Sequence, residues 1–378
     1  MKIRLLTLLS AAALVILCYA CATDDSQLKT TAYLDLPETP YTYKASTNNH
    51  IATLGRVLFY DRQLSVNNSM SCNTCHKQSL AFADNAAFSK GFENVLTSRN
   101  AMPIQNLQSN IFTIGGGIME GDISLPKIND NSFIGGQSVL FWDGRENNLR
   151  SMVLKPVVNH VEMGIRDMNK LSQKLSDIPY YKDLFQKAYG SEEVTTEKIA
   201  EALTSFLINI TATDTKLDRL IKGKDRLSAL ELQGQNLFQS VYDCNACHQV
   251  QSTHGYVFAG TFSNIGLDAQ YADPGLENVT RRAADAGKFR IPSLRNVALT
   301  APYMHDGRFA TLDEVINHYS HGIEDHPNLD PRLRQQNGQP MQMNIPDQDK
   351  KAIIAFLHTL TDHEMINDVR FSNPFKAH

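Results

Sequence analysis

Apolar residues recur at the spacing of amphipathic helices in four stretches of the chain, which form two similar pairs. In the first half the stripes cover residues 51–58 and 199–210, and in the second half they cover residues 228–238 and 353–360. This three-to-four-residue period predicts helices that each bury one face. Each half therefore has an opening helix and a closing helix.

The third stretch also shows where its helix starts. Ser228 and Glu231 have the spacing of a capping box, and Leu230, Leu237 and Phe238 form the apolar stripe behind it. We expect a helix that begins at this box and runs towards the cysteine pair that follows.

A C-x-x-C-H sequence follows each opening helix. The two copies are Cys72, Cys75 and His76 in the first half, and Cys244, Cys247 and His248 in the second. This motif attaches a c-type haem: the two sulfur atoms add to the haem vinyl groups and the histidine binds iron. The sequence predicts two covalent haems, with His76 and His248 as iron ligands.

A second repeat extends the duplication beyond the haem motifs. Asp-Gly-Arg follows Trp142 and, in the other half, His305, and a leucine stands at the same offset after each copy. The predicted fold class is all-α, with two class I cytochrome c-like domains arranged as a pseudo-duplicated pair. We place them at residues 46–215 and 216–378. The stretches 110–137 and 252–287 lack a period and predict loops.

The N-terminus predicts export. Lys2 and Arg4 precede an apolar run over residues 5–17, which is short for a membrane span, so residues 1–20 are typical of a signal peptide. Ala20-Cys21 resembles a lipoprotein processing site, although Cys18 stands where leucine is usual; cleavage after Ala20 to give a free protein is the alternative. We expect a periplasmic or cell-envelope protein, with residues 21–45 as a tether or surface arm.

Composition and charge narrow the classes of partner. The 378 residues are 42% hydrophobic and carry a formal charge of −4, which becomes −6 when Lys2 and Arg4 leave with the signal peptide. This balance argues against a nucleic-acid partner and mildly favours a positively charged electron donor. The six cysteines all belong to the export region or the haem motifs, so no disulfide framework is expected.

Three further runs give the chain a family resemblance. They are Phe-Trp-Asp-Gly-Arg at 141–145, Glu-Met-Gly at 162–164 and Leu-Thr-Ala-Pro-Tyr-Met-His-Asp-Gly-Arg at 299–308. Together with the haem motifs, they make residues 46–365 resemble the bacterial di-haem cytochrome c peroxidase family, which includes MauG-like members. The resemblance implies that the haem bound at His76 reacts with peroxide and that the haem bound at His248 relays electrons.

The resemblance also implies two residues that act in the reaction. Trp142, the single tryptophan, matches the residue between the haems; the alternative is a buried core aromatic. Glu162 matches the distal carboxylate, which takes a proton from the peroxide oxygen that binds iron and returns it to the oxygen that leaves. The alternative for Glu162 is a solvated surface charge.

Two departures from the family pattern affect the first haem. Met152 stands where glutamine is frequent, which puts a second polar donor beside Glu162 in question. The loop over residues 77–98, which carries an iron-blocking histidine in the classical peroxidases, has none and places Phe92 near that position. The first iron is therefore predicted to be five-coordinate when oxidised.

The sixth ligand of the second iron has several candidates. MauG-like members have tyrosine where this chain has Tyr319, a hard oxygen donor that favours ferric iron. Met304 is the alternative by ligand chemistry, with Met341 and Met343 behind it, although a methionine at position 304 also suits core packing. His305 is expected near this haem or its propionates, or else as a hydrogen-bonded loop residue.

Two sites for other metal ions are considered. The resemblance implies calcium between the domains, held by Asn100 and by the backbone carbonyls of Thr300 and Pro302. A second cluster, His318, His321 and His326, is not favoured as a metal site because it lacks a regular ligand spacing.

The predicted protein is an enzyme: a di-haem peroxidase that reduces hydrogen peroxide to water with electrons from a small donor such as a mono-haem cytochrome c. One alternative is a MauG-like oxidase of a partner protein or organic donor, and another is a non-enzymatic electron carrier. Family members also form homodimers.

Overall fold

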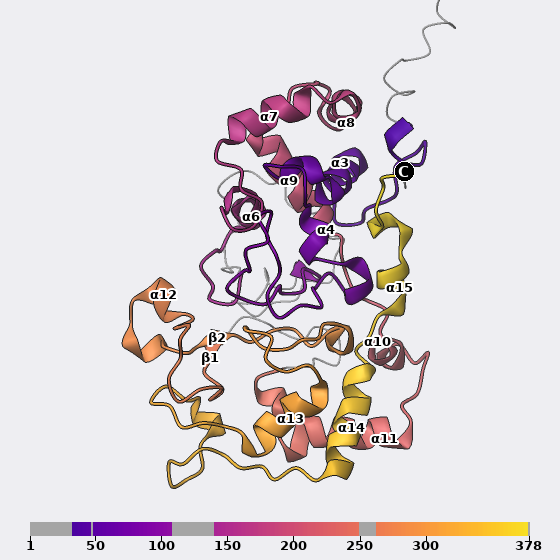
Figure 1. Ribbon diagram of the computed structural model, residues 1–378. Coiled ribbons are helices and arrows are strands. Elements are labelled where there is room, and N and C mark those ends of the chain that lie inside the picture. Colours follow the sequence, from indigo (N-terminus) through magenta and orange to yellow (C-terminus); the bar gives the residue numbers. More distant parts are fainter. Residues whose placement is uncertain (1–31, 47, 108–139, 249–261, 377–378) are drawn as a thin grey trace, which may run out of the picture.

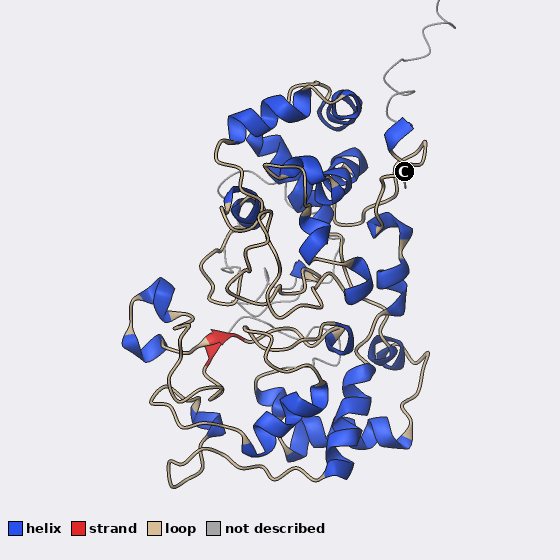
Figure 2. Cartoon of the chain, in the orientation of Figure 1, coloured by secondary structure: helices blue, strands red, loops and turns tan. Residues whose placement is uncertain are grey.

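The computed structural model describes residues 32–46, 48–107, 140–248 and 262–376, and its helices gather into two groups, one above the other in Figure 1. Helices and loops make up nearly all of the described chain, as Figure 2 shows. The strands β1 (Phe262–Ser263) and β2 (Phe289–Arg290) pair antiparallel. This mostly helical architecture confirms the all-α prediction.

The elements follow the order of the two halves. The first group contains α3 (Asn49–Tyr60), α4 (Cys72–Cys75), α5 (Leu149–Met152), α6 (Lys155–Val158), α7 (Met168–Ser176), α8 (Pro179–Tyr189) and α9 (Thr196–Leu207). After α10 (Lys216–Ile221), the second group contains α11 (Ala229–Asn236), α12 (Glu277–Thr280), α13 (Leu312–His321) and α14 (Asp347–His358), and α15 (His363–Asn367) follows. The 3₁₀ helices are η1 (Arg62–Leu64), η2 (Gln78–Leu80), η5 (Cys244–Ala246), η6 (Ala283–Asp285), η7 (Val297–Leu299), η8 (Pro331–Leu333) and η9 (Val369–Phe371), and η4 (Leu237–Val241) is a π-helix.

The four helices expected from the apolar stripes are α3, α9, α11 and α14, and they cross in two equivalent pairs. A Cβ atom on Gly55 of α3 would lie 1.8 Å from the carbonyl oxygen of Ala202 in α9. One on Gly234 of α11 would lie 1.8 Å from the carbonyl oxygen of Ala352 in α14. Only glycine permits such close contact between helix backbones, so each half depends on one glycine at its helix crossing.

The Asp-Gly-Arg loops also share a backbone conformation. Phe141 and Met304 have φ values of 63° and 75°, and the two glycines of the motif, Gly144 and Gly307, have φ values of 69° and 66°. One isolated bridge pairs residue 140 with residue 146, and another pairs residue 303 with residue 309. The duplication seen in the sequence is thus a duplication of loop geometry.

The two ends of the described chain both return to the first core. Leu34 and Tyr43, from the segment expected to be a tether or surface arm, are 2% exposed, and Met365 and Phe371 bury beside them. Residues 34 and 375 form an isolated bridge. In Figure 1 the yellow helix α15 lies beside the first group rather than the second. The predicted domain division at residue 216 stays a prediction, and the last residues of the second domain contact the first core.

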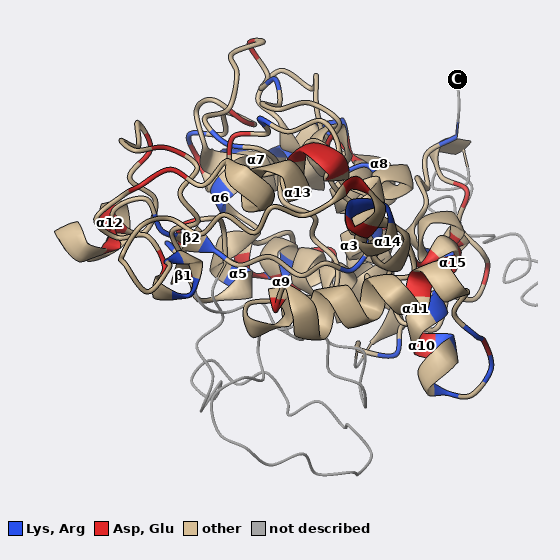
Figure 3. Cartoon of the chain, turned by 90° about the horizontal axis from the view of Figure 1, so that it is seen from below, with Lys and Arg blue, Asp and Glu red and all other residues tan. Residues whose placement is uncertain are grey.

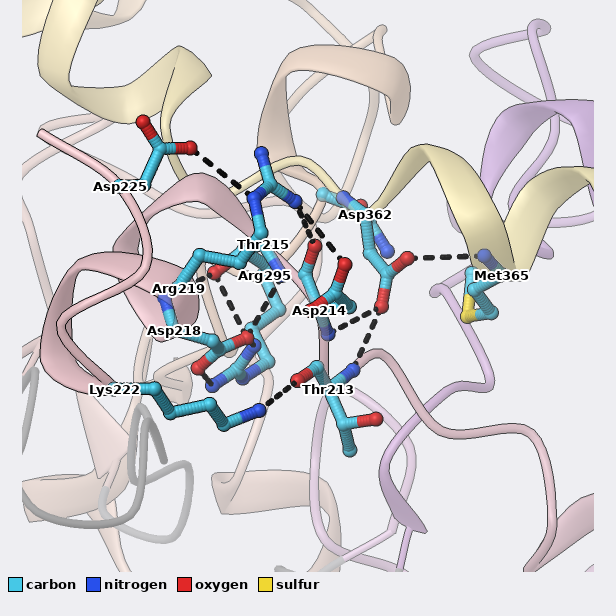
Figure 4. A network of polar contacts seen from close by, with 11 residues as sticks. Thr213, Asp214, Thr215, Asp218, Arg219, Lys222, Asp225, Arg295, Asp362 and Met365 are labelled. Carbon is cyan, nitrogen blue, oxygen red and sulfur yellow. Dashed lines mark hydrogen bonds and ion pairs between the residues drawn. The ribbon is translucent and has the colours of Figure 1, made fainter.

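A polar network fixes the junction between the halves (Figure 4). Arg295 donates to both carboxylate oxygens of Asp218 at 2.7 Å, and these two side chains are almost fully buried. The carboxylate of Asp362 accepts from the backbone nitrogens of Thr213 and Asp214. A buried pair needs good geometry and further hydrogen bonds to offset its desolvation, and this network supplies both.

Two expectations differ from the structure. Leu230 is 46% exposed, because the contact of α11 with α14 is centred on Gly234 and the first turn of α11 extends past it. The predicted loop 252–287 contains β1, α12 and η6 in its described part. The predicted signal peptide, Cys18, Cys21 and the loop 110–137 lie outside the described residues.

The described residues show no separation of charge and no helix suited to crossing a membrane. Figure 3 shows acidic and basic segments alternating along the chain, for example around α10 and α15. None of the described helices is both long enough and apolar enough to span a bilayer.

The helix crossings give a prediction. Gly55→Ala and Gly234→Ala should each lower the free energy of unfolding by about 3 kcal/mol, the upper part of the overpacking range, because the new methyl group meets backbone rather than a movable side chain. Gly190→Ala is the control: its φ is 70° but nothing lies within 4 Å of the new Cβ, so it should cost about 1–2 kcal/mol. Urea unfolding of the holoprotein measures the three values, and equal losses in all of them would contradict the backbone contact.

Candidate functional site

The first haem motif lies on one helical turn and orients its histidine. Cys72 and Cys75 are three residues apart on α4 with free thiols, and His76 ends the helix. The Nδ1 atom of His76 lies 2.9 Å from the carbonyl oxygen of Phe82, which leaves Nε2 to bind iron. Burial lowers the pKa of His76 and so favours the neutral imidazole that a metal requires.

The second motif is built in the same way from other elements. Cys244 and Cys247 flank the turn η5, and Nδ1 of His248 lies 3.2 Å from the carbonyl oxygen of Pro292. Burial lowers the pKa of His248 to about 4. Both motifs therefore present two thiols and one neutral imidazole held by a backbone carbonyl, which is the donor set of a c-type haem.

A buried arginine provides an independent test of this fit. Arg290 is 8% exposed, its Nε atom has no hydrogen-bond partner among the described residues, and burial lowers its pKa to about 10. Its Nη2 atom contacts the sulfur of Met102 at 3.3 Å. A buried cation without a protein anion is costly, and a haem propionate is an anion of suitable kind. Arg290 was not predicted from the sequence, where its only signal is its position between Phe289 and Ile291.

Glu162 lies beside the first motif. Its side chain is half-buried, and Oε1 accepts a hydrogen bond from Nδ2 of Asn159 at 2.8 Å. Burial raises the pKa of Glu162, opposed by the charge of Arg145. Burial raises the pKa of Cys72 to about 12 and that of Cys75 to about 11, and the charge of Glu162 contributes to both. The carboxylate and the haem-attaching sulfurs thus share one site.

The loop over residues 77–98 packs against the segment that carries Glu162. The backbone nitrogen of Phe92 donates to the carbonyl oxygen of Glu162 at 3.0 Å. The ring of Phe92 covers Gly164, where a Cβ atom would come within 2.6 Å of a ring carbon. Met152 is 9% exposed in the first core. A phenyl ring, which cannot bind iron, therefore packs on the segment that carries the predicted distal carboxylate.

Trp142 lies where the two halves meet. Its Nε1 atom donates to the carbonyl oxygen of Asn100 at 2.9 Å, and its own carbonyl oxygen accepts from the backbone nitrogen of Arg290 at 2.8 Å. The backbone nitrogen of Asn100 donates to the carbonyl oxygen of His305 at 2.7 Å. Trp142 is therefore held by residues of both halves rather than buried inside one core.

His305 is a buried residue of this junction. It is 5% exposed and stacks on Phe289, with ring centroids 3.7 Å apart and an interplanar angle of 14°. Beside it, Arg99 pairs with Asp143 and with Asp273, each at 2.6 Å. These contacts agree with the interpretation of His305 as a hydrogen-bonded loop residue. A contact between His305 and the second haem stays a prediction.

The candidates for the second iron occupy different places. Tyr319 lies on α13 close to the second motif, and burial raises its pKa, with smaller contributions from the charges of Cys247 and Cys244. Tyr319, Met341 and Met343 pack against one small core cluster. Met304 sits half-buried in the Asp-Gly-Arg loop, and its carbonyl oxygen accepts from the nitrogen of Gly307. Tyr319 and Met304 both stay candidates.

The other metal predictions fare as follows. Within the described ranges, no group of three or more His, Cys, Asp or Glu could hold a metal ion, and His318 and His326 hydrogen-bond elsewhere while His321 is exposed. For calcium, Asn100 contacts the segment that follows Thr300 and Pro302 through its bond to His305. The calcium site stays a prediction.

Comparison with known proteins agrees with this site. A model of the family described as di-haem cytochrome c peroxidase matches residues 49–226. The cytochrome c551 peroxidase of Nitrosomonas europaea is 31% identical over 275 residues, which cover 71% of this chain and 72% of that protein. The methylamine utilization protein MauG of Paracoccus denitrificans is 30% identical over 356 residues, which cover 82% of this chain and 88% of that protein.

Solved structures share the fold. The crystal structure of a MauG-like protein associated with microbial copper homeostasis aligns with a TM-score of 0.70 at 30% identity and covers 90% of this chain and 97% of that one. The diheme peroxidase BthA from Burkholderia thailandensis aligns with a TM-score of 0.66 at 19% identity and covers 90% and 94%. The second likeness is one of fold alone.

The second motif gives a prediction about its ligand. Tyr319→Phe should raise the reduction potential of the haem at Cys244 and Cys247, because a hard oxygen donor that favours ferric iron is removed. Tyr271→Phe is the control, since the Tyr271 hydroxyl hydrogen-bonds to Asn264 and to the nitrogen of Leu267. Spectroelectrochemical titration measures both variants. An unchanged potential in Tyr319→Phe would favour Met304.

Proposed function

The chain belongs to the di-haem cytochrome c peroxidase family and is a peroxidase-type oxidoreductase, and we propose that it reduces hydrogen peroxide to water with electrons from a small c-type cytochrome. The observation that carries the proposal is the position of Glu162. It is a half-buried carboxylate that Asn159 holds by a hydrogen bond, and its charge contributes to the raised pKa of both sulfurs of the first motif. A haem held there by Cys72, Cys75 and His76 would supply the redox chemistry for the reaction with peroxide.

Glu162 acts as the proton carrier of the reaction. As a carboxylate it accepts the proton of the peroxide oxygen that faces the metal, and as a carboxylic acid it returns that proton to the oxygen that leaves as water. Asn159 holds its Oε1 atom by a hydrogen bond of 2.8 Å, which fixes the direction of the carboxylate. Met152 and Phe92 supply no proton donor beside it, so a single carboxylate performs both transfers.

Trp142 is the electron path between the halves. Its indole is bonded to Asn100 of the first half and its backbone to Arg290 of the second, so its position depends on both. Electrons that enter at the second motif reach the first motif through this residue. His248 and Tyr319 hold the electron-entry site, and His76 holds the peroxide site.

The surface beside the second motif suits a small donor protein. Leu230, Leu232 and Val241, just before Cys244, are 46%, 57% and 56% exposed. Exposed apolar side chains that precede the second motif along the chain offer contact area to a transient redox partner. The proposal has three further parts. The protein is exported and a lipid on Cys21 holds it at the cell envelope. A calcium ion binds at Asn100, and two copies of the chain form a homodimer.

A MauG-like oxidase is the second candidate. It is favoured by the absence of histidine from residues 77–98 and by the position of Tyr319 beside Cys244 and Cys247. Steady-state turnover of peroxide with reduced cytochrome c separates the two candidates. Rapid turnover supports the peroxidase, and slow turnover with stoichiometric peroxide consumption supports the oxidase.

The proton role of Glu162 gives a prediction. Glu162→Gln should lower kcat/KM for peroxide on the order of 10²–10⁴-fold. In the unchanged protein kcat/KM should fall as acid protonates Glu162, with a midpoint above the pKa of about 4.3 of an ordinary glutamate. The variant should lose this acid limb.

A second glutamate, Glu146, provides the control for the pH dependence. Glu146→Gln is the control variant. Burial raises the pKa of Glu146, but hydrogen bonds from Ser151 and the backbone outweigh burial and lower it overall. This variant should keep the acid limb. An acid limb that persists in Glu162→Gln would contradict the proton role.

A further inference from the structure

Two buried tyrosines share one carboxylate at the edge of the first core. The hydroxyl groups of Tyr180 and Tyr181, at the start of α8, each donate to Oδ2 of Asp61 at 2.7 Å. The other oxygen, Oδ1, accepts from the backbone nitrogen of Gln63. Tyr181 is 0% exposed and Asp61 is 4% exposed. These hydrogen bonds hold the carboxylate of Asp61 next to the hydroxyl groups of Tyr180 and Tyr181.

The rings form a row from the first haem motif to the surface. The centroids of Tyr180 and Tyr181 are 4.8 Å apart, and those of Tyr33 and Tyr180 are 5.8 Å apart. At the inner end, Tyr181 belongs to the buried core against which Cys72 packs, and the charge of that sulfur contributes to the pKa of Tyr181. At the outer end, Tyr33 is 47% exposed. The row therefore joins a haem-attaching residue to solvent.

A cavity of about 360 Å³ opens at the outer end of the row. Its lining residues are Tyr33, Asp61, Gln63, Ile178, Pro179, Tyr180, Phe375 and Lys376. Three aromatic rings and two apolar side chains suit a flat aromatic molecule, and Gln63 offers a polar partner for a hydroxyl group. The volume falls within the range of small-molecule sites.

We propose that this cavity is a second donor site, where a small phenol gives electrons to the first haem through Tyr180 and Tyr181. The inference rests on the proposed peroxide reaction, which supplies the oxidant. It differs from that reaction in its donor and in its path, because neither Trp142 nor a residue of the second motif lines the cavity.

The chemistry balances with peroxide as the oxidant. One hydrogen peroxide and two phenols give two water molecules and two phenoxyl radicals, and each phenol loses one electron and one proton. Tyr181 gives an electron to the haem at Cys72 while its hydroxyl proton moves to Oδ2 of Asp61. Tyr180 and then the bound phenol restore that electron, the proton returns to Tyr181, and the phenol's own proton leaves to water.

Asp61 is needed because the tyrosines are neutral. Burial raises the pKa of Tyr180 and of Tyr181 far above the ordinary value, and the neighbouring carboxylate raises them further. A neutral phenol that loses an electron must also lose its proton, and a carboxylate 2.7 Å from both hydroxyl oxygens can accept it.

The first test locates the radical. The holoprotein is mixed with one equivalent of peroxide without donor, frozen, and examined by electron paramagnetic resonance, with ring-deuterated tyrosine to identify the signal. We expect a tyrosyl radical that is lost in Tyr181→Phe and weakened in Asp61→Asn. Tyr189→Phe is the control: Tyr189 lies on the same helix, is half-buried and donates instead to the carbonyl oxygen of Lys198. It should keep the signal.

The second test uses phenol itself as the probe. Phenol binding to the ferric holoprotein, followed by calorimetry without peroxide, should be lost in Gln63→Trp, which fills the cavity. This change keeps the backbone nitrogen that bonds to Asp61. Phenol should also quench the radical in the unchanged protein, and the radical should persist with phenol present in Gln63→Trp.

The outcomes separate this inference from the proposed function. If the protein consumes peroxide with reduced cytochrome c while the radical survives in Tyr181→Phe, or while phenol binding survives in Gln63→Trp, the second donor site alone is overturned. Absence of any reaction with peroxide would overturn both proposals.

Discussion

The main chain of Asn100 holds the two halves in register. Its carbonyl oxygen accepts from the indole of Trp142 and its nitrogen donates to the carbonyl oxygen of His305. Arg99 next to it pairs with Asp143 and Asp273. If this short segment moved, Trp142 would lose its bond to the first half while keeping the one to Arg290. The proposed electron passage through Trp142 would therefore depend on the backbone of Asn100 rather than on its side chain.

A duplicated frame carries two unequal sites. The glycine helix crossings, the Asp-Gly-Arg loops and the carbonyl-held histidines are the same in both halves. The residues that face each motif differ: Glu162 with Phe92 at the first, and Tyr319 at the second. A proton-carrying carboxylate beside an iron suits peroxide chemistry, and a tyrosine oxygen suits stabilisation of the ferric state. The proposed division of labour would thus come from a few residue differences within one architecture.

The sequence predicted features that depend on local pattern. The C-x-x-C-H motifs and the four helices follow from spacing, and the capping box at Ser228 forms as expected. The partners of His76 and His248 could not be predicted, because both are backbone carbonyls presented by tertiary packing. Arg290 was missed for the same reason, since its isolation appears only when the surrounding chain is in place. The exposure of Leu230 shows that an apolar stripe predicts which face of a helix is buried. It does not predict how much of that face the neighbouring helix covers.

The central claim is that the iron bound by His76 is open on the side of Glu162 while the iron bound by His248 has a protein ligand on its sixth side. An electron paramagnetic resonance spectrum of the fully oxidised holoprotein, without added peroxide, tests this directly. The account predicts a high-spin ferric signal from the first haem beside a low-spin signal from the second. Two low-spin signals, neither of them altered by peroxide, would contradict it.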